Sequence, residues 1–291
     1  MIDSPAVTPI KSPGPWLAAW KRLTRQRASM LALGFLVFIV LLCGLAPRLS
    51  PYEESNQDSN SVTKAPSASH WMGTDQLGRD IATRVLYGGR VSLLVGLVAT
   101  AVAMLIGVTY GLISGLAGGR IDSLLMRVVD ILYCFPFIAF VILLTIMFGR
   151  SFVLLFVAIG AVEWLTTARV VRAQVLSLKN QEFVLAARVC GARWWRILFR
   201  HLLPNVMGQV VIYASLTVPG VMLLEAVLSF LGLGVQPPAS SWGVLIQEGA
   251  ANMETSPWML IFPGLAFTTT LLALNTLGDG LRDALDPKSG N

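Results

Sequence analysis

The sequence has few charged residues for its length. Only 13% of its 291 residues are charged and 55% are hydrophobic, and the mean hydropathy is +0.68. A soluble domain of this size needs far more polar surface, so the composition excludes an ordinary soluble protein and predicts an integral membrane protein. The net charge of +6 then requires no nucleic-acid partner, because basic residues beside membrane spans explain it.

Signals for catalysis and metal binding are also missing. The three cysteines, Cys43, Cys134 and Cys190, have no paired spacing, and the only histidines are His70 and His201. These residues predict neither a disulfide framework, nor a metal site, nor the nucleophile or metal cluster of a membrane enzyme. The sequence also lacks a G-x-x-x-x-G-K-[ST] phosphate loop. We therefore expect a chain that is not an enzyme, does not hydrolyse ATP by that route and binds no cofactor directly.

Long apolar runs are abundant instead. Four runs contain no charged residue, and they are residues 28–47, 91–119, 131–149 and 255–278. Two further runs, 151–168 and 206–230, carry one carboxylate each, Glu163 and Glu225. Each run reaches or nearly reaches the ~20 residues that a transmembrane helix needs. The pattern predicts an all-α protein with six transmembrane helices.

Lysine and arginine are distributed unevenly between the loops. Sixteen of the 22 fall in segments that are cytoplasmic if the N-terminus lies inside. Because cytoplasmic loops carry the excess of basic residues, N-in, C-in topology is predicted. The expected organisation is a cytoplasmic N-terminal tail (1–29), a first transmembrane helix (30–46), an extracytoplasmic loop (47–90), a core with five transmembrane helices (91–280) and a cytoplasmic C-terminal tail (281–291).

Residues 180–204 form the one long polar, basic segment between apolar spans in the second half of the chain. Asn180 is a plausible N-cap for a short helix, and Gly191 supplies the left-handed residue that ends it. A second short helix is expected over residues 192–203, with Pro204 as its stop. Two short helices therefore lie between the predicted spans four and five, on the cytoplasmic side.

The spacing of this segment resembles a known motif. Ala186-Ala187, followed by Gly191 and then Pro204, is similar to the cytoplasmic coupling motif of ABC importer permeases. That motif reads Glu-Ala-Ala, three residues, Gly, nine residues, Ile-x-Leu-Pro. The resemblance implies the type I ABC importer permease fold, with the two short helices as coupling helices.

Two positions depart from the motif, since Leu185 stands in place of Glu and His201 in place of Ile. The departures affect a polar contact at the first position and leave the docking role in place. An alternative from the residues alone is a basic amphipathic loop that lies on the membrane surface. The candidate ATPase-coupling residues are Ala186, Ala187, Arg188, Gly191, Arg193 and Pro204.

Other segments resemble the C-type subunit of peptide and nickel ABC permeases. They are the Gly-Thr-Asp to Gly-Arg-Asp run at 73–80, the Gly- and Pro-rich run at 231–243 and the Leu-Gly-Asp-Gly run at 277–280. The resemblance extends from Trp71 to Lys288 and is greatest for the oligopeptide permease C subunit. It implies half of a translocation pore in the bacterial cytoplasmic membrane.

The same resemblance implies partners. They are a second homologous permease subunit, two cytoplasmic ATPases that bind ATP and Mg, and an extracytoplasmic peptide-binding protein. Within the family, dipeptide and nickel-chelate importers share most of the motifs. A different class, an ion-coupled secondary transporter that uses Glu163 and Glu225 as proton sites, is an alternative.

The first external loop offers candidate contacts for the binding protein. Thr74 or Asp75 can cap a short helix ending near Gly78, and Asp80 can open the next helix. Arg79 and Arg84 are available as ion-pair partners for these carboxylates. The contact candidates are Asp75, Arg79 and Asp80. A membrane-surface helix that leads into the second span is the alternative.

Candidates for the translocation pathway are residues that destabilise a transmembrane helix unless they line a passage or contact a partner. Prolines remove a backbone hydrogen bond, so Pro136, Pro219 and Pro263 are expected to break their helices and to line a passage, although ordinary kinks are an alternative. Glu225 either faces the pathway or makes a helix-packing contact. The remaining pathway or gate candidates are Gly232, Gly234 and Trp242, with Trp242 expected at the membrane–water boundary.

Two ion pairs are also expected near the inner face. Arg127 and Asp130 are three residues apart and can neutralise each other on one helical face. Glu163 can pair with Arg169 or with another helix.

Overall fold

The computed structural model describes residues 14–149 and 152–286, which are mainly helical. The N-terminal residues 1–13 and C-terminal residues 287–291 of the predicted tails lie outside the described residues. The elements are α1 (Pro15–Leu23), α2 (Arg27–Gly44), α3 (Ala46–Leu49), η1 (Ser59–Ser61), α4 (Ile81–Ala117), α5 (Gly119–Tyr133), α6 (Phe137–Phe148), α7 (Phe152–Leu178), α8 (Glu182–Val189), α9 (Trp194–Arg196), η2 (Ile197–Leu202), α10 (Leu203–Phe230), α11 (Trp242–Ala251) and α12 (Trp258–Leu285).

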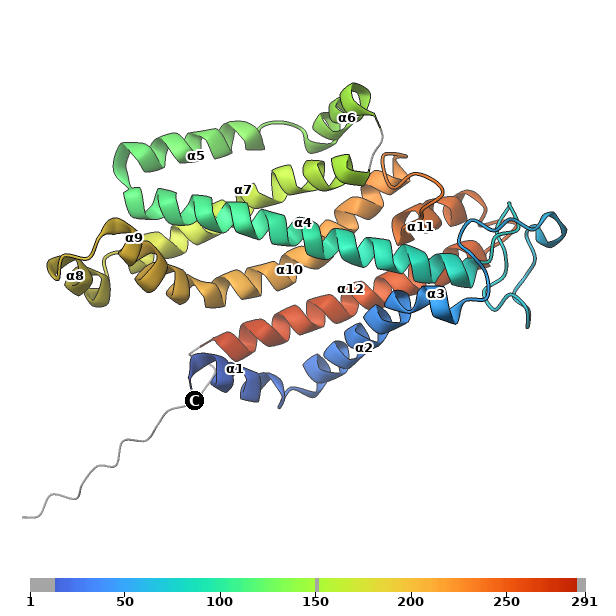
Figure 1. Ribbon diagram of the computed structural model, residues 1–291, viewed down its shortest axis with the longest axis horizontal. Coiled ribbons are helices and arrows are strands. Elements are labelled where there is room, and N and C mark those ends of the chain that lie inside the picture. Colours follow the sequence, from blue (N-terminus) through green and yellow to red (C-terminus); the bar gives the residue numbers. More distant parts are fainter. Residues whose placement is uncertain (1–13, 150–151, 287–291) are drawn as a thin grey trace, which may run out of the picture.

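The long helices lie side by side in one bundle (Figure 1). Helices α4, α7 and α10 form one part, and α12 packs on α10 and α2. Helices α8 and α9 lie at one end of the bundle, whereas α3, α11 and the loop before α4 lie at the opposite end (Figure 1). Helix α1 packs against α12 on the side of the bundle away from α11.

Four helical runs among the described residues are long and apolar enough to cross a membrane. They are α2, α4, the continuous run Trp194–Phe230 and α12. A fifth span is present if α5 and α6, which are bent by 78° relative to each other, count as one. The predicted fourth span corresponds to α7, whose first side chains lie outside the described residues. The all-helical membrane architecture agrees with the prediction, whereas the number of six spans is not established by these helices alone.

The prediction of a second, separate coupling helix is wrong. Helix α9 continues as the π-helical run η2 and then as α10. Pro204 lies in the first turn of α10 and does not stop the helix. The π-helical run before Pro204 interrupts the regular i→i−4 hydrogen-bond pattern, and a proline, which has no N–H to donate, is tolerated at such a break. Helix α8 is therefore the one short helix of the segment that is separate from a span.

The three intramembrane prolines have different effects. At Pro136 the chain does break, because α5 ends at Tyr133 and α6 begins at Phe137. Pro219 lies inside α10 and Pro263 inside α12, and neither ends its helix. The prediction of three broken helices is therefore confirmed only for the span that contains Pro136.

Glycines set the close packing of α4 on α7. A Cβ atom added at Gly107 would lie 2.5 Å from Thr167 Cβ, and one at Gly111 would lie 2.5 Å from the carbonyl oxygen of Ala168. Real Cβ atoms do not approach so closely, so the two backbones can meet only because these side chains are absent. Stripes of small residues pack membrane helices in this way.

Candidate functional site

Helix α8 begins after Gln181, whose side chain makes no capping hydrogen bond. The predicted N-cap, Asn180, therefore lies one residue too early. After Cys190 the chain reverses at Gly191, with φ of +76°. The amide of Gly191 donates to the carbonyl of Arg188 at 2.9 Å. The predicted left-handed end of the helix at Gly191 is confirmed.

One apolar side chain fixes α8 to the bundle. Val184 is fully buried and belongs to a cluster with residues of α4, α7, η2 and α10. Val175 of α7 and Leu202 of η2, both fully buried, are members of the same cluster. Close-packed side chains therefore hold α8 against the long helices.

The surface of α8, α9 and η2 that faces away from the bundle is exposed and apolar. Five large apolar residues define what we call the coupling surface, and they are Phe183, Leu185, Val189, Trp195 and Phe199. Val189 is 89% exposed and Trp195 is 60% exposed. Exposed patches of this kind mark interaction sites on a protein or a membrane.

Basic side chains surround the coupling surface. Four arginines in or beside α8, α9 and η2 are exposed, and they are Arg188, Arg193, Arg196 and Arg200. Among the other predicted coupling residues, Ala186, Gly191 and Pro204 are exposed and Ala187 is half-buried. The structure thus brings the predicted coupling residues to one end of the bundle (Figure 1). Apolar anchors with a basic rim suit a partner whose groove is apolar and whose edge is acidic.

At the opposite end, an ion-pair cluster joins the loop before α4 to two helices. The guanidinium of Arg84 in α4 donates to Asp75 Oδ2 at 2.8 Å and to Glu248 Oε2 of α11 at 2.5 Å. Arg79 adds a bond from Nε to Asp75 Oδ2 at 2.7 Å. The side chains of Arg84 and Asp75 are only 3% and 2% exposed. Buried charges of this kind require such pairing.

The predicted contacts for a binding protein are mostly internal. Asp80 caps α4 by accepting from the Thr83 amide at 2.8 Å, as predicted, and its other oxygen lies 3.0 Å from His70 Nδ1. Asp75 accepts from the amides of Leu77 and Arg79 in a turn, so the predicted short helix before Gly78 is absent. Asp75 and Asp80 are buried and Arg79 is half-buried, which gives these side chains a role in holding the loop.

The same loop contains a carboxylate with a shifted pKa. The Ser61 hydroxyl and the Asn60 amide donate to Asp58 and hold the pKa of its carboxyl below the usual range. These bonds close the single turn of η1. The loop is therefore ordered by local capping as well as by the ion-pair cluster.

Glu225 lies in a closed network of serines. It is fully buried, and it accepts from Ser229 at 2.6 Å, from Ser241 at 2.7 Å and from Ser92 at 3.5 Å. These serines come from α10, from the N-cap of α11 and from α4. The geometry therefore supports the helix-packing alternative for Glu225 over the pathway alternative.

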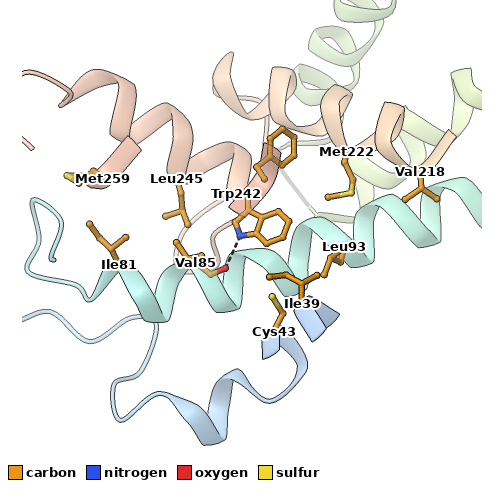
Figure 2. Packing of buried hydrophobic residues seen from close by; sticks show 11 residues of the cluster. Ile39, Cys43, Ile81, Val85, Leu93, Val218, Met222, Trp242, Leu245 and Met259 are labelled. Carbon is orange, nitrogen blue, oxygen red and sulfur yellow. Dashed lines mark hydrogen bonds between the residues drawn. The ribbon is translucent and has the colours of Figure 1, made fainter. Parts of the chain in front are cut away.

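Trp242 is a core residue, so the predicted place at the membrane–water boundary is wrong. Its indole is fully buried and donates to the carbonyl of Val85 at 2.9 Å (Figure 2). Phe267 of α12 packs against it edge to face. The indole N–H finds its partner inside the bundle, which removes the need for an interfacial position.

The two glycines predicted near the outer mouth lie beside this core. Gly232 has φ of +76° in the turn after α10. Gly234 approaches Ser229 so closely that a side chain would collide with it. Both glycines thus shape the chain reversal between α10 and α11.

The predicted pairs of Arg127 with Asp130 and of Glu163 with Arg169 are wrong, whereas the alternative partner for Glu163 on another helix stays a prediction. Asp130 of α5 accepts from Arg169 of α7 at 2.7 Å, and neither the pair with Arg127 nor the pair of Glu163 with Arg169 forms. The two helices run side by side, and Asp130 faces Arg169 across their contact. Pairing between helices therefore replaces the pairing expected from sequence spacing.

Comparison with known proteins identifies two parts of the chain that match protein families. Residues 107–291 match the model of the family described as "binding-protein-dependent transport system inner membrane component". Residues 14–66 match the N-terminal transmembrane domain of oligopeptide transport permease C. The chain belongs to this family of ABC importer permeases. The first match includes the whole coupling surface.

Several curated relatives of this permease are similar over nearly their whole length. The oligopeptide transport system permease protein OppC of Haemophilus influenzae is 50% identical over 94% of this chain and 88% of its own. The dipeptide transport system permease protein DppC of Bacillus subtilis is 45% identical over 93% and 85%. The glutathione transport system permease protein GsiD of Pectobacterium atrosepticum is 40% identical over 94% and 91%.

Sequence reasoning missed two pairs that hold this permease together. Glu248 pairs with Arg84 over a separation of 164 positions, and Arg172 pairs with Asp122 over 50 positions. The charges themselves were the available signal, because a charged residue next to an apolar run needs a partner. Which carboxylate each arginine meets depends on how helices α4, α5, α7 and α11 pack, so spacing along the sequence does not indicate it.

The burial of Trp242 leads to a stability prediction for the permease. Replacing Trp242 with alanine is expected to destabilise the fold by about 3–5 kcal/mol, because the substitution leaves a cavity among close-packed helices. Thermal unfolding of the detergent-solubilised permease measures the effect. Trp195→Ala is the control, since that indole is exposed. Equal midpoints for the two variants would contradict the core position of Trp242.

Proposed function

We propose that this chain is a permease subunit of an ATP-driven importer and forms half of a translocation pore for peptides, with oligopeptides as the main substrates. The observation that carries the proposal is the coupling surface, which is apolar, exposed and fixed to the bundle through Val184. Family membership supports the transport role. The relatives bear the names of oligopeptide, dipeptide and glutathione permeases, which favours peptides over a nickel chelate.

The proposed topology has six spans with both termini in the cytoplasm of a bacterium. The coupling surface, the basic N-terminal helix α1 and the end of α12 then share the cytoplasmic side. The domain limits proposed from the sequence, 30–46 for the first span and 91–280 for the core, remain part of this proposal. Helix α11 and the loop with the ion-pair cluster face the extracytoplasmic side.

The proposed partners follow from this arrangement. Two cytoplasmic ATPases, which bind ATP and Mg, dock on the coupling surfaces of this chain and of a second, homologous permease subunit. An extracytoplasmic binding protein delivers the peptide to the loop around Asp75, Arg79 and Asp80. When nucleotide closes the ATPases, their movement displaces α8 and reorients the bundle.

The ion-coupled alternative has weaker support. A proton site in a transporter needs a route to water on each side in turn. Glu225 is fully enclosed and bonded to three serines. The geometry therefore favours the ATP-driven proposal.

Reconstitution tests the proposed function. The permease, its sister subunit, the ATPases and the binding protein are incorporated into proteoliposomes, and uptake of a labelled peptide library is measured. We expect uptake only with ATP and the binding protein, with no loss when ion gradients are collapsed. Uptake that continues without ATP and stops with an ionophore would contradict the proposal.

A further inference from the structure

The bent segment α5–α6 has few buried contacts with the rest of the chain. The buried residues of α5 are Asp122 and Val129, and that of α6 is Val141. At its start, Gly118 and Gly119 both have positive φ, +66° and +55°, and the 78° bend follows at its middle. Two glycines in the left-handed region provide a junction with little resistance to rotation. The segment therefore needs specific contacts to follow the rest of the bundle.

Helices α4, α7 and α8, in contrast, form a tightly packed body. The glycine stripe of α4 continues at Gly115, where a Cβ atom would lie 2.7 Å from Val175 Cβ of α7. Val175 packs in the same cluster as Val184 of α8. Displacement of α8 is therefore transmitted directly to α4 and α7.

One charged contact attaches α5 to that body with good geometry. Arg172 of α7 donates from Nε to Asp122 Oδ1 at 2.5 Å and from Nη2 to Oδ2 at 2.6 Å. The Ser114 hydroxyl of α4 donates to the same carboxylate. The Asp122 side chain is only 10% exposed. A bidentate, partly buried arginine–carboxylate pair is among the strongest polar contacts in proteins.

The other polar contacts of α5 are weaker. Asp130 and Arg169 make a single bond and are 65% and 42% exposed, and exposed pairs contribute little. Neutral hydrogen bonds join Tyr110 to the carbonyl of Leu125 and Tyr133 to Thr166. The Asp122–Arg172 pair is thus the principal charged attachment of α5.

We propose that Asp122 and Arg172 are positioning residues that make the bent segment α5–α6 follow the movement of α8. Arg172 lies in the second half of α7, six residues before its end at Leu178, and Asp122 lies in the first turn of α5. This inference rests on the proposed function. In this scheme the Asp122–Arg172 pair transmits the movement of the ATPases to the α5–α6 span, which is bent at Pro136.

Transport and ATP hydrolysis, measured together in the full complex, test the inference. We expect Asp122→Asn to lower peptide uptake about fivefold or more, as for loss of a typical coupling energy, while binding-protein-stimulated ATPase activity is retained. Asp130→Asn is the matched control, because Asp130 also lies on α5 and pairs with an arginine of α7, and its uptake is expected to change less than about twofold. The swapped variant Asp122→Arg/Arg172→Asp is expected to regain part of the uptake.

A distance measurement adds a readout that a merely structural role would not change. In a background without the exposed Cys134 and Cys190, spin labels are placed at Leu105→Cys in α4 and Ile146→Cys in α6, both exposed positions. Their separation is expected to stay constant when nucleotide is trapped, because the ion pair makes α5–α6 move together with α4 and α7. Asp122→Asn is expected to change or broaden that separation when nucleotide is trapped. Wild-type uptake in Asp122→Asn, or parallel loss of uptake and ATPase activity, would overturn the inference. Absence of ATP-driven uptake in the wild-type complex would instead contradict the proposed function.

Discussion

Replacing Val189 with aspartate is expected to lower ATP-driven peptide uptake at least tenfold and to separate the permease from its ATPases. Val189 is the most exposed large apolar residue of α8, at 89%. A carboxylate there would have to be desolvated in an apolar partner groove, and loss of a central interface anchor costs about 2 kcal/mol or more. Such a cost corresponds to more than a tenfold loss of affinity. Uptake in proteoliposomes and co-purification of the ATPases measure the two effects.

The control for this variant is Val62→Asp. Val62 is also exposed, at 43%, but lies in the loop before α4, at the opposite end of the bundle. Its substitution is expected to leave ATPase co-purification unchanged. Because Val189 is almost fully exposed, Val189→Asp should unfold at the wild-type temperature. Normal uptake in Val189→Asp would remove α8 from the proposed ATPase interface.

Replacing Arg84 with methionine is expected to destabilise the permease by about 3 kcal/mol, because it removes a counter-charge from the buried carboxylate of Asp75 and from the partly exposed carboxylate of Glu248. Asp75 keeps the bond from Arg79 Nε and the bonds from the amides of Leu77 and Arg79, whereas Glu248 keeps only a contact of 3.7 Å to the Arg79 side chain. The unfolding midpoint of the solubilised permease should fall by several degrees. The expected loss arises at the end of the bundle opposite α8, so it tests the fold of the loop before α4 separately from the coupling surface.

Two further variants refine this prediction. Arg90→Met, at an exposed position of α4, is expected to change stability by less than about 0.5 kcal/mol. Arg84→Met/Glu248→Met is expected to be more stable than Arg84→Met alone, because the second change removes a carboxylate that has lost its partner. Identical unfolding of Arg84→Met and Arg90→Met would show that the cluster does not hold the loop to α11.

The sequence was sufficient for features that depend on local chemistry. Charge-free runs predicted the membrane helices, Gly191 predicted the left-handed end of α8, and Asp80 predicted the cap of α4. In each case the interaction that forms the feature involves residues only a few positions from the residue that predicted it. The exposed coupling residues followed from motif spacing, because the motif is itself a short local segment.

Features that depend on packing could not be read from spacing. Tryptophan is a residue type typical of the membrane–water boundary, but residues of α4, α10 and α12 enclose Trp242. Asp130 lies three residues from Arg127, yet Arg169 of α7 provides its partner. Pro204 predicts the end of a helix, whereas the helix continues through it because a π-helical run lies just before it. Tertiary placement decided each of these cases.

The exposed Cys190 allows the most direct test of the account. Cys43 is buried, and Cys134, which is also exposed, is removed as Cys134→Ser. A membrane-impermeant maleimide is applied to right-side-out and inside-out vesicles, with and without co-expressed ATPases. We predict that Cys190 is labelled only in inside-out vesicles and that the ATPases protect it. Labelling from the outside, or labelling that the ATPases leave unchanged, would contradict a cytoplasmic coupling surface.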